Sequence, residues 1–239
     1  MKSRIAWFAV LFLVLAIPNW ADLVPTYDNG PINGTTDAWT INFGYIVSDS
    51  FVPYPYGTVY GFEFGVWEFS GDKLSSVQWS ITSAPLSWGP VPPYAHGGSP
   101  IVFGSGTASG SNLTDQFISS NQYGYDIDLI TVSNLNVYAN PGVKYWLNLY
   151  NAAVPSGDPV YWDENSGKGC GGTGCPSQAF ESAVGTIASE AFTVTGCIGC
   201  DCYSSCAFGP GSVPEPGGIV LFGSGILGLV GVLRRKLRS

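Results

Sequence analysis

Apolar and polar side chains alternate with a period of two over much of the chain, and this alternation is the feature that most restricts the fold. The alternating segments cover residues 39–45, 60–66, 77–81, 125–129, 134–137 and 145–149. Successive side chains of a β-strand point to opposite faces of a sheet, so each segment is expected to pack one face on a core and to turn the other to water. In the segment 125–129, this places Tyr125, Ile127 and Leu129 on the core side and Asp126 and Asp128 in water.

Clusters of turn-forming residues separate these segments. They comprise residues 28–30, 70–72, 90–100, 104–112, 140–142 and 155–158, which are rich in Gly, Pro, Asn, Asp and Ser. Many short strands with frequent turns predict an all-β fold, an antiparallel β-sandwich that is jelly-roll-like. An immunoglobulin-like topology is the alternative, although the Cys…Trp…Cys spacing of immunoglobulin domains is absent.

The N-terminal end has the composition of an export signal. Lys2 and Arg4 precede an uninterrupted apolar run over residues 5–17, and the small residue Ala21 follows shortly after. A charged start, a short apolar run and a small residue are the parts of a secretory signal peptide. The run is shorter than the roughly 20 residues that an ordinary membrane span needs. We therefore expect a signal helix within residues 1–21 and an exported protein.

The C-terminal end carries a second apolar segment. Residues 217–233 contain only Gly, Ser and apolar residues, and the basic tail Arg234, Arg235, Lys236 and Arg238 follows directly. Backbone groups in lipid must satisfy one another, which predicts a transmembrane helix. The positive-inside rule places the tail in the cytoplasm and the rest of the chain outside. Immediately before the segment stands the tetrapeptide Val213, Pro214, Glu215 and Pro216.

This tetrapeptide, the apolar segment and the basic tail, in that order, resemble the PEP-CTERM sorting signal. The resemblance implies that Pro214-Glu215-Pro216 is recognised by exosortase, a membrane-embedded processing enzyme. It also implies a Gram-negative-type bacterium that makes exopolysaccharide. The protein would be anchored in the inner membrane by its C-terminal helix before processing, and would then belong to the cell surface or the extracellular matrix.

The two signals divide the chain into four parts. We expect a signal peptide at 1–21, a β-sandwich ectodomain at 22–196, a cysteine-rich spacer at 197–212 and the sorting signal with its helix at 213–239. Phrases such as Tyr27-Asp28-Asn29-Gly30-Pro31 and residues 158–167 resemble a group of PEP-CTERM ectodomains that has no assigned activity. This second resemblance supports one β-domain and implies nothing about its chemistry.

The charge of the ectodomain excludes some partners. Residues 22–212 contain three Lys, no Arg and sixteen Asp and Glu, so their formal charge is 3 − 16 = −13. Nucleic acids and anionic lipids are bound by basic faces, and we expect neither as a partner. Divalent cations and neutral glycans are compatible with this charge.

All six cysteines lie in the last third of the chain: Cys170, Cys175, Cys197, Cys200, Cys202 and Cys206. An even number of cysteines in an exported protein indicates disulfides. Cys170 and Cys175 enclose a Gly-rich loop and are expected to form a local bridge. The other four are expected to stiffen the spacer, in a pairing that spacing does not decide. The alternative for these four is a metal site with soft sulfur ligands.

The sequence offers little for catalysis. The only histidine is His96, in a Pro/Gly-rich segment without a nucleophile-elbow motif. Glu63 and Glu68 are the residue types of a glycosidase pair, but five positions along one strand place them on opposite faces. We therefore expect no enzyme activity and no cofactor apart from calcium.

Acidic residues and loop aromatics are the candidates for ligand binding. Asp158, Asp163 and Glu164 crowd one predicted loop, and hard oxygen ligands in loops suit Ca²⁺, although the spacing is not that of an EF-hand. Asp126 and Asp128, two residues apart on one strand face, are the second choice for the same ion. Ordinary solvated carboxylates are the alternative. The aromatic residues Tyr54, Tyr56, Trp88 and Tyr94 fall in Pro/Gly-rich loops, where exposed rings can stack on sugars or cap the core.

These features together predict a non-enzymatic surface or matrix protein, sorted through PEP-CTERM processing and associated with exopolysaccharide. The alternative function is that of a carbohydrate-binding module that holds glycan with its loop aromatics.

Overall fold

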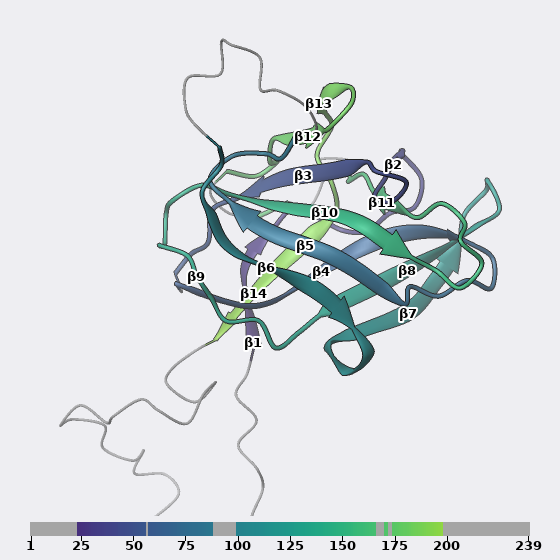
Figure 1. The fold of residues 1–239 in the computed structure, drawn as a ribbon, viewed down its shortest axis with the longest axis horizontal. Helices are drawn as coiled ribbons and strands as arrows, with labels where there is room; N and C mark the ends of the chain where they lie inside the picture. The colour runs from purple at the N-terminus through teal and green to yellow at the C-terminus, as the bar shows by residue number, and fades with distance from the viewer. Residues whose placement is uncertain (1–22, 56, 88–98, 166–169, 172–173, 198–239) are drawn as a thin grey trace, which may run out of the picture. The chain divides into compact units, whose positions relative to one another are not determined.

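The computed structural model describes residues 23–55, 57–87, 99–165, 170–171 and 174–197, and these residues form β-strands and one short 3₁₀ turn (Figure 1). The strands are β1 (Leu23–Asp28), β2 (Ala38–Thr40), β3 (Ile46–Phe51), β4 (Thr58–Phe69), β5 (Ser76–Thr82), β6 (Val102–Ser109), β7 (Leu113–Ser120), β8 (Tyr125–Val132), β9 (Val137–Tyr138), β10 (Tyr145–Ala153), β11 (Tyr161–Asp163), β12 (Ala179–Glu181), β13 (Gly185–Ile187) and β14 (Phe192–Cys197), and the 3₁₀ turn η1 is Gly110–Asn112. The expected all-β class is confirmed.

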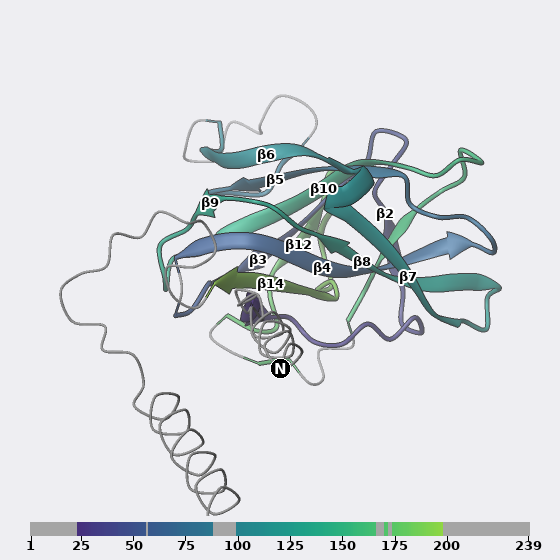
Figure 2. The ribbon, with the colours of Figure 1, turned by 90° about the horizontal axis from the view of Figure 1, so that it is seen from below.

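Two antiparallel sheets lie face to face (Figure 2). The first sheet has eight strands, with β1, β14, β4, β11 and β2 in that order, β8 and β9 paired to β4, and β7 paired to β8. The second sheet has the order β13-β12-β3-β10-β5-β6. The chain passes between them repeatedly, because β3 and β5 belong to the second sheet and β4 between them belongs to the first. Each sheet therefore combines residues that are far apart in the sequence.

The long strand β4 is central to the first sheet and supplies much of the core. It pairs with β14 on one side and with β8 on the other. Phe62, Phe64 and Val66 point inward from it and have no exposed surface. The ring of Phe62 meets that of Trp79 from β5 edge to face, with 6.2 Å between centroids, which joins the two sheets. Burial of each such side chain contributes about 1.5–3 kcal/mol.

The strand predicted over residues 39–45 is wrong beyond its first residues. Strand β2 ends at Thr40, and the chain then turns at Phe43 and Gly44, which have φ angles of 54° and 88°. A positive φ is incompatible with an extended strand. The apolar residues of this segment are only partly used in the core, because Phe43 is 63% and Tyr45 is 44% exposed.

The turn predicted over residues 104–112 is also wrong for most of its length, because strand β6 extends from Val102 to Ser109. Its glycines allow close contact with bulky neighbours. A Cβ atom on Gly104 would lie 2.5 Å from Val137, and one on Gly106 would lie 3.3 Å from the ring of Trp79. Glycine is found in strands where another group approaches the backbone closely, and the turn-like composition of this segment reflects such packing.

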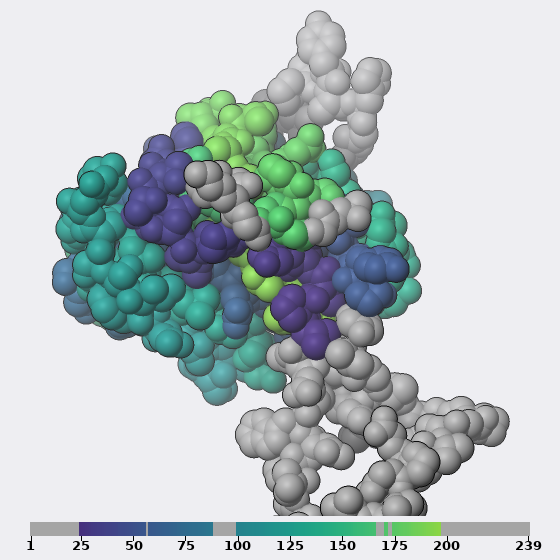
Figure 3. Space-filling view, turned by 180° about the vertical axis from the view of Figure 1, so that it is seen from behind, coloured from purple at the N-terminus to yellow at the C-terminus, as the bar shows by residue number. Residues whose placement is uncertain are grey.

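Strand β8 is covered on both faces, so the prediction that one of its faces is exposed to solvent is wrong. Asp128 was expected in water but has no exposed surface, and it shares the inner face with Ile130 and Val132. On the outer face, Ile127 is covered by the segment around Gly34, where a Cβ atom would lie 2.6 Å from its side chain. Figure 3 shows residues of the N-terminal part of the chain (purple) beside teal residues of the middle of the chain on one face of the molecule.

Among the described residues, no helix is both long and apolar enough to cross a membrane. The predicted signal helix in 1–21, the predicted transmembrane helix in 217–233 and the predicted spacer, apart from Cys197, lie outside the described residues. The described strands begin at Leu23 and end at Cys197.

Candidate functional site

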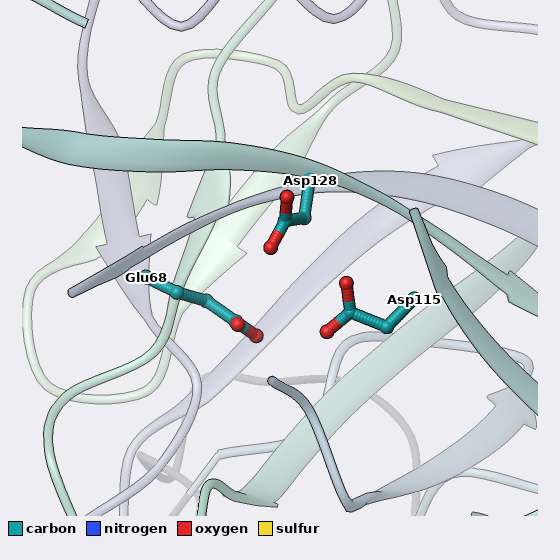
Figure 4. Close-up of side chains that lie close together, drawn as sticks. All are labelled: Glu68, Asp115 and Asp128. Carbon is teal, nitrogen blue, oxygen red and sulfur yellow. The ribbon is translucent and has the colours of Figure 1, made fainter. Parts of the chain in front are cut away.

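Three carboxylates meet at one end of the core, and we call them the acidic triad: Glu68 of β4, Asp115 of β7 and Asp128 of β8 (Figure 4). One oxygen of each lies within 4.8 Å of one oxygen of each of the others. The strands that carry them are neighbours, since Val66 pairs with Asp128 and Asp115 pairs with Ile130. All three carboxylates point toward a common centre in Figure 4.

The period of the strands explains why the acidic triad faces inward. Side chains two residues apart share a face, and Glu68 follows Phe62, Phe64 and Val66 on the inner face of β4. The interior of a protein accepts a carboxylate only where it is paired or neutralised. An acidic residue at a core position is therefore the signal that reveals this site, and it can be read once the inner face of each strand is known.

Lys73, in the loop between β4 and β5, supplies a positive charge to the acidic triad. Its Nζ lies 2.9 Å from Oδ1 of Asp115 and 2.6 Å from Oδ2 of Asp128. The backbone N–H of Leu74 donates to Oδ2 of Asp115 at 2.6 Å. The Lys73 side chain is 50% exposed, so its ammonium closes the triad from the solvent side.

Three oxygens of the acidic triad have no hydrogen-bond partner among the described residues: Oε1 and Oε2 of Glu68 and Oδ1 of Asp128. Both residues have no exposed surface. Burial, together with the charges of Asp115 and Asp128, raises the pKa of Glu68 to about 8. Burial likewise raises the pKa of Asp128. With every group ionised, three carboxylates and one ammonium give −3 + 1 = −2, and the raised pKa of Glu68 means that a proton offsets part of this charge at neutral pH.

Among the described residues, the group of three acidic side chains that converges does not include the predicted calcium ligands Asp158, Asp163 and Glu164. Asp163 is fully buried, and its carboxylate accepts hydrogen bonds from Trp67 Nε1 at 2.6 Å and from the backbone N–H groups of Asn33 and Gly34 at 2.8 and 3.1 Å. Asp163 therefore holds the segment around Gly34 against the first sheet. Burial raises the pKa of both Asp163 and Glu164.

A second buried acidic pair joins the two sheets. Oδ2 of Asp49, in β3, accepts a hydrogen bond of 2.6 Å from the backbone N–H of Glu190, which lies just before β14. Asn29 donates to the same oxygen at 3.3 Å. Both acidic side chains lack exposed surface. Burial raises the pKa of Asp49 to about 7, and burial together with the charge of Asp49 raises the pKa of Glu190 well above its ordinary value.

Five aromatic side chains form a row on the outer face of the first sheet, and we call them the aromatic row: Trp67, Phe69, Tyr123, Tyr125 and Tyr161. Trp67 stacks on Tyr123 with 5.8 Å between ring centroids, and Tyr125 meets Phe69 at 5.1 Å and Tyr161 at 5.7 Å. Tyr123 is 57% exposed. A hollow of about 180 Å³ beside them is lined by Trp67, Tyr125, Tyr161, Asp37 and Ala38. None of these residues was among the predicted glycan contacts, and alternation assigned Tyr125 to the core side of its strand.

Of the predicted glycan contacts, Tyr54 lies beyond the end of β3 and is 69% exposed. Tyr56, Trp88 and Tyr94 lie outside the described residues, as does His96. Glu63 and Glu68 lie on opposite faces of β4, as expected. Glu63 accepts a hydrogen bond from Thr131 Oγ1 at 3.3 Å on the outer face, whereas Glu68 is enclosed in the core.

The expected local disulfide is present between Cys170 and Cys175, whose Cα atoms are 5.9 Å apart. It lies against the first strand, because the hydroxyl of Tyr27 donates to the carbonyl of Gly174 at 3.2 Å. Cys197 is the last residue of β14. Cys200, Cys202 and Cys206 lie outside the described residues, so their pairing stays a prediction.

Comparison with known proteins identifies one segment of the chain. A family model of the PEP-CTERM protein-sorting motif matches residues 212–236. The match contains Val213, Pro214, Glu215 and Pro216 and the basic residues Arg234, Arg235 and Lys236, whereas Arg238 follows it. No curated protein matches the chain. The matched segment lies outside the described residues.

Proposed function

We propose that this chain, which carries a PEP-CTERM protein-sorting motif, is a non-enzymatic component of the cell surface or extracellular matrix, associated with exopolysaccharide. The observation that carries the proposal is the match of the sorting motif to residues 212–236. The motif implies an exported precursor that is anchored in the membrane and is processed by an exosortase-type enzyme.

The C-terminal residues 217–239 have the physical properties that membrane anchoring before PEP-CTERM processing requires. The apolar residues 217–233 can satisfy their backbone groups as a helix in lipid, and the basic tail keeps the C-terminus in the cytoplasm. Cleavage near Pro214-Glu215-Pro216 would separate this anchor from the ectodomain. The helix would then be needed for sorting and would be absent from the mature protein.

Two further properties support an extracellular place of action. The disulfide between Cys170 and Cys175 is typical of oxidising compartments. The formal charge of −13 over residues 22–212 keeps the ectodomain soluble and favours neutral glycans or cations over nucleic acids as partners.

The placement of the acidic residues supports a non-enzymatic role. Glu63 and Glu68 cannot act together on one glycosidic bond from opposite faces of β4. The carboxylates of Glu68 and Asp128 are close together, but both residues lack exposed surface, which leaves no room for a sugar ring beside them.

We further propose that the ectodomain is a jelly roll with an N-terminal signal helix and a C-terminal transmembrane helix in the precursor. The strand orders β1-β14-β4 with β8 beside β4, and β3-β10-β5-β6 in the facing sheet, support this connectivity. In a jelly roll, two antiparallel sheets of this kind are linked by two Greek keys. Strand β7 adds a hairpin at the edge beside β8.

The sorting proposal is tested by mass spectrometry of the mature protein from cells with and without an exosortase. We expect the mature C-terminus to lie near Pro214-Glu215-Pro216 only where the enzyme is present. Replacement of these three residues by Ala should retain the tail, and Pro210→Ala, just before the motif, should leave processing unchanged. A mature protein from native cells that still contains Arg238 would contradict processing and leave a plain membrane anchor.

A second candidate function is glycan binding, which the aromatic row favours. Tyr123 is exposed and stacks on Trp67, which lines the hollow together with the half-buried Tyr125 and Tyr161. Such rings are suited to stacking on sugars. Saturable binding in a polysaccharide pull-down, competed by free sugar and lost in Tyr123→Ala, would support it. Tyr138→Ala serves as the control, because Tyr138 is 65% exposed but lies outside the row. Loss of binding in Trp88→Ala instead would assign the contact to the predicted loop aromatics.

A further inference from the structure

We propose that the acidic triad is a Ca²⁺ site, in which the metal takes the enclosed carboxylates of Glu68 and Asp128 as ligands and competes with the ammonium of Lys73. The proposal goes beyond the sorting function, since it concerns the ectodomain alone. It rests on the convergence of Glu68, Asp115 and Asp128 within 4.8 Å and on the enclosed oxygens that have no partner.

The unpartnered oxygens are the decisive observation. A buried carboxylate oxygen without a hydrogen bond costs about 1–3 kcal/mol or more, so a fold retains such a group where a partner meets it. Both oxygens of Glu68 and Oδ1 of Asp128 lack a partner among the described residues, and both residues have no exposed surface. Figure 4 shows the carboxylates of Glu68 and Asp128 pointing toward the centre of the triad.

Lys73 forms ion pairs only with the carboxylate oxygens on the solvent side of the acidic triad. Its ammonium contacts Oδ1 of Asp115 and Oδ2 of Asp128, whereas the oxygens of Glu68 have no partner. Since the Lys73 side chain is 50% exposed, it can turn into water without opening the core. A divalent ion that displaces the ammonium would leave the three ionised carboxylates with −3 + 2 = −1.

The ligand chemistry favours Ca²⁺ over other ions. Carboxylate oxygens are hard ligands, and Ca²⁺ accepts them in flexible geometry, including both oxygens of one Glu. Mg²⁺ retains several waters and prefers sites with one or two carboxylates. The affinity of extracellular Ca²⁺ modules is modest, with dissociation constants on the order of 10⁻⁴–10⁻³ M.

The test measures Ca²⁺ binding and thermal unfolding of the full-length chain after treatment with EDTA. We expect CaCl₂ at ten times its dissociation constant to raise the Tm by about 3–6 °C. Calorimetric titration should give one site per chain. Glu68→Gln keeps the shape of the side chain and should abolish both effects. Glu63→Gln, on the outer face of the same strand, is the matched control and should retain both.

Lys73→Gln provides a test that does not depend on the folding of a core variant. If the metal and the ammonium compete for the same carboxylates, this change should tighten Ca²⁺ binding by about 3–10-fold, because a nearby like charge is removed. An unchanged affinity for Ca²⁺ in Lys73→Gln would overturn the proposal. The absence of Ca²⁺ binding in both the unmodified protein and this variant would also overturn it. The variant should also lower the Tm of the metal-free chain.

Other outcomes identify other origins of a calcium effect. A Tm shift that persists in Glu68→Gln and disappears in Asp158→Asn would move the site to the loop 158–164 and refute the triad. An equal shift with MgCl₂ at the same concentration would indicate screening of the acidic surface and would likewise refute it.

Discussion

At the residue scale, Asp163 has the clearest structural role of the buried carboxylates. Three donors from two separate elements converge on it: the indole N–H of Trp67 and the backbone N–H groups of Asn33 and Gly34. The sequence placed Asp163 in a calcium loop because acidic residues crowd around it. In the structure its oxygens are occupied by protein donors.

We expect Asp163→Ala to destabilise the protein by about 2–4 kcal/mol, because it leaves buried donors without an acceptor. Urea unfolding followed by tryptophan fluorescence measures this change. Asp158→Ala is the matched control, since Asp158 is half-buried and should change stability by less than about 0.5–1 kcal/mol. Equal effects of the two substitutions would contradict the assigned role.

At the scale of elements, alternation predicted β4, β5, β8 and β10, but it failed for most of residues 134–137, where β9 begins only at Val137. Two further segments also differ from the prediction. Residues 39–45 have the period of a strand, yet Phe43 and Gly44 turn the chain. Residues 104–109 have the composition of a turn, yet they form most of β6. In both cases neighbours distant in sequence contact the segment: Val160 and Ala152 hydrogen-bond to the backbone of Ile41, and Trp79 and Val137 lie beside β6.

We expect Gly104→Val to destabilise the protein by about 1–3 kcal/mol, because the new side chain would overlap Val137 and force β6 away from its position. Chemical denaturation measures the change. Ser105→Val, the next residue of the same strand, is exposed and should be tolerated, since a β-branched residue suits a strand. A stable Gly104→Val protein would show that the contact with Val137 is not restrictive.

At the scale of the whole molecule, Asp49 and Glu190 link the two sheets and make stability depend on pH. The folded-state pKa of Asp49 is about 7, above its ordinary value of about 3.8, and that of Glu190 is also raised. At pH values between about 4 and about 7, these two carboxyl groups are deprotonated in the unfolded chain but keep their protons in the folded chain. Stability should therefore fall as the pH rises from about 4 to about 7.

Urea midpoints measured at pH 5 and pH 8 check this sign, with the higher midpoint expected at pH 5. Asp49→Asn is neutral at every pH and should reduce the difference between the two midpoints. A midpoint that is higher at pH 8, or an unchanged difference in Asp49→Asn, would contradict the assignment of the pH effect to this pair.

The sequence by itself determined the features that depend only on residues close to one another along the chain. The sorting motif is a contiguous segment at 212–236, and the disulfide joins cysteines only five positions apart. The β-class follows from a period of two, which is a property of each strand alone. Features of this kind need no knowledge of which strands pair.

Only the tertiary structure decided which side chains meet. Glu68, Asp115 and Asp128 come from three strands whose pairing brings them together, and the aromatic row combines residues of β4, β8, β11 and the turn before β8. Alternation states that two sets of side chains lie on opposite faces, but it does not state which face is covered. In β8 both faces are covered, so the assignment of Asp128 to water was wrong, and the acidic triad became visible only with the fold. The physical reason is that burial depends on packing between distant segments, whereas periodicity depends only on the backbone of one strand.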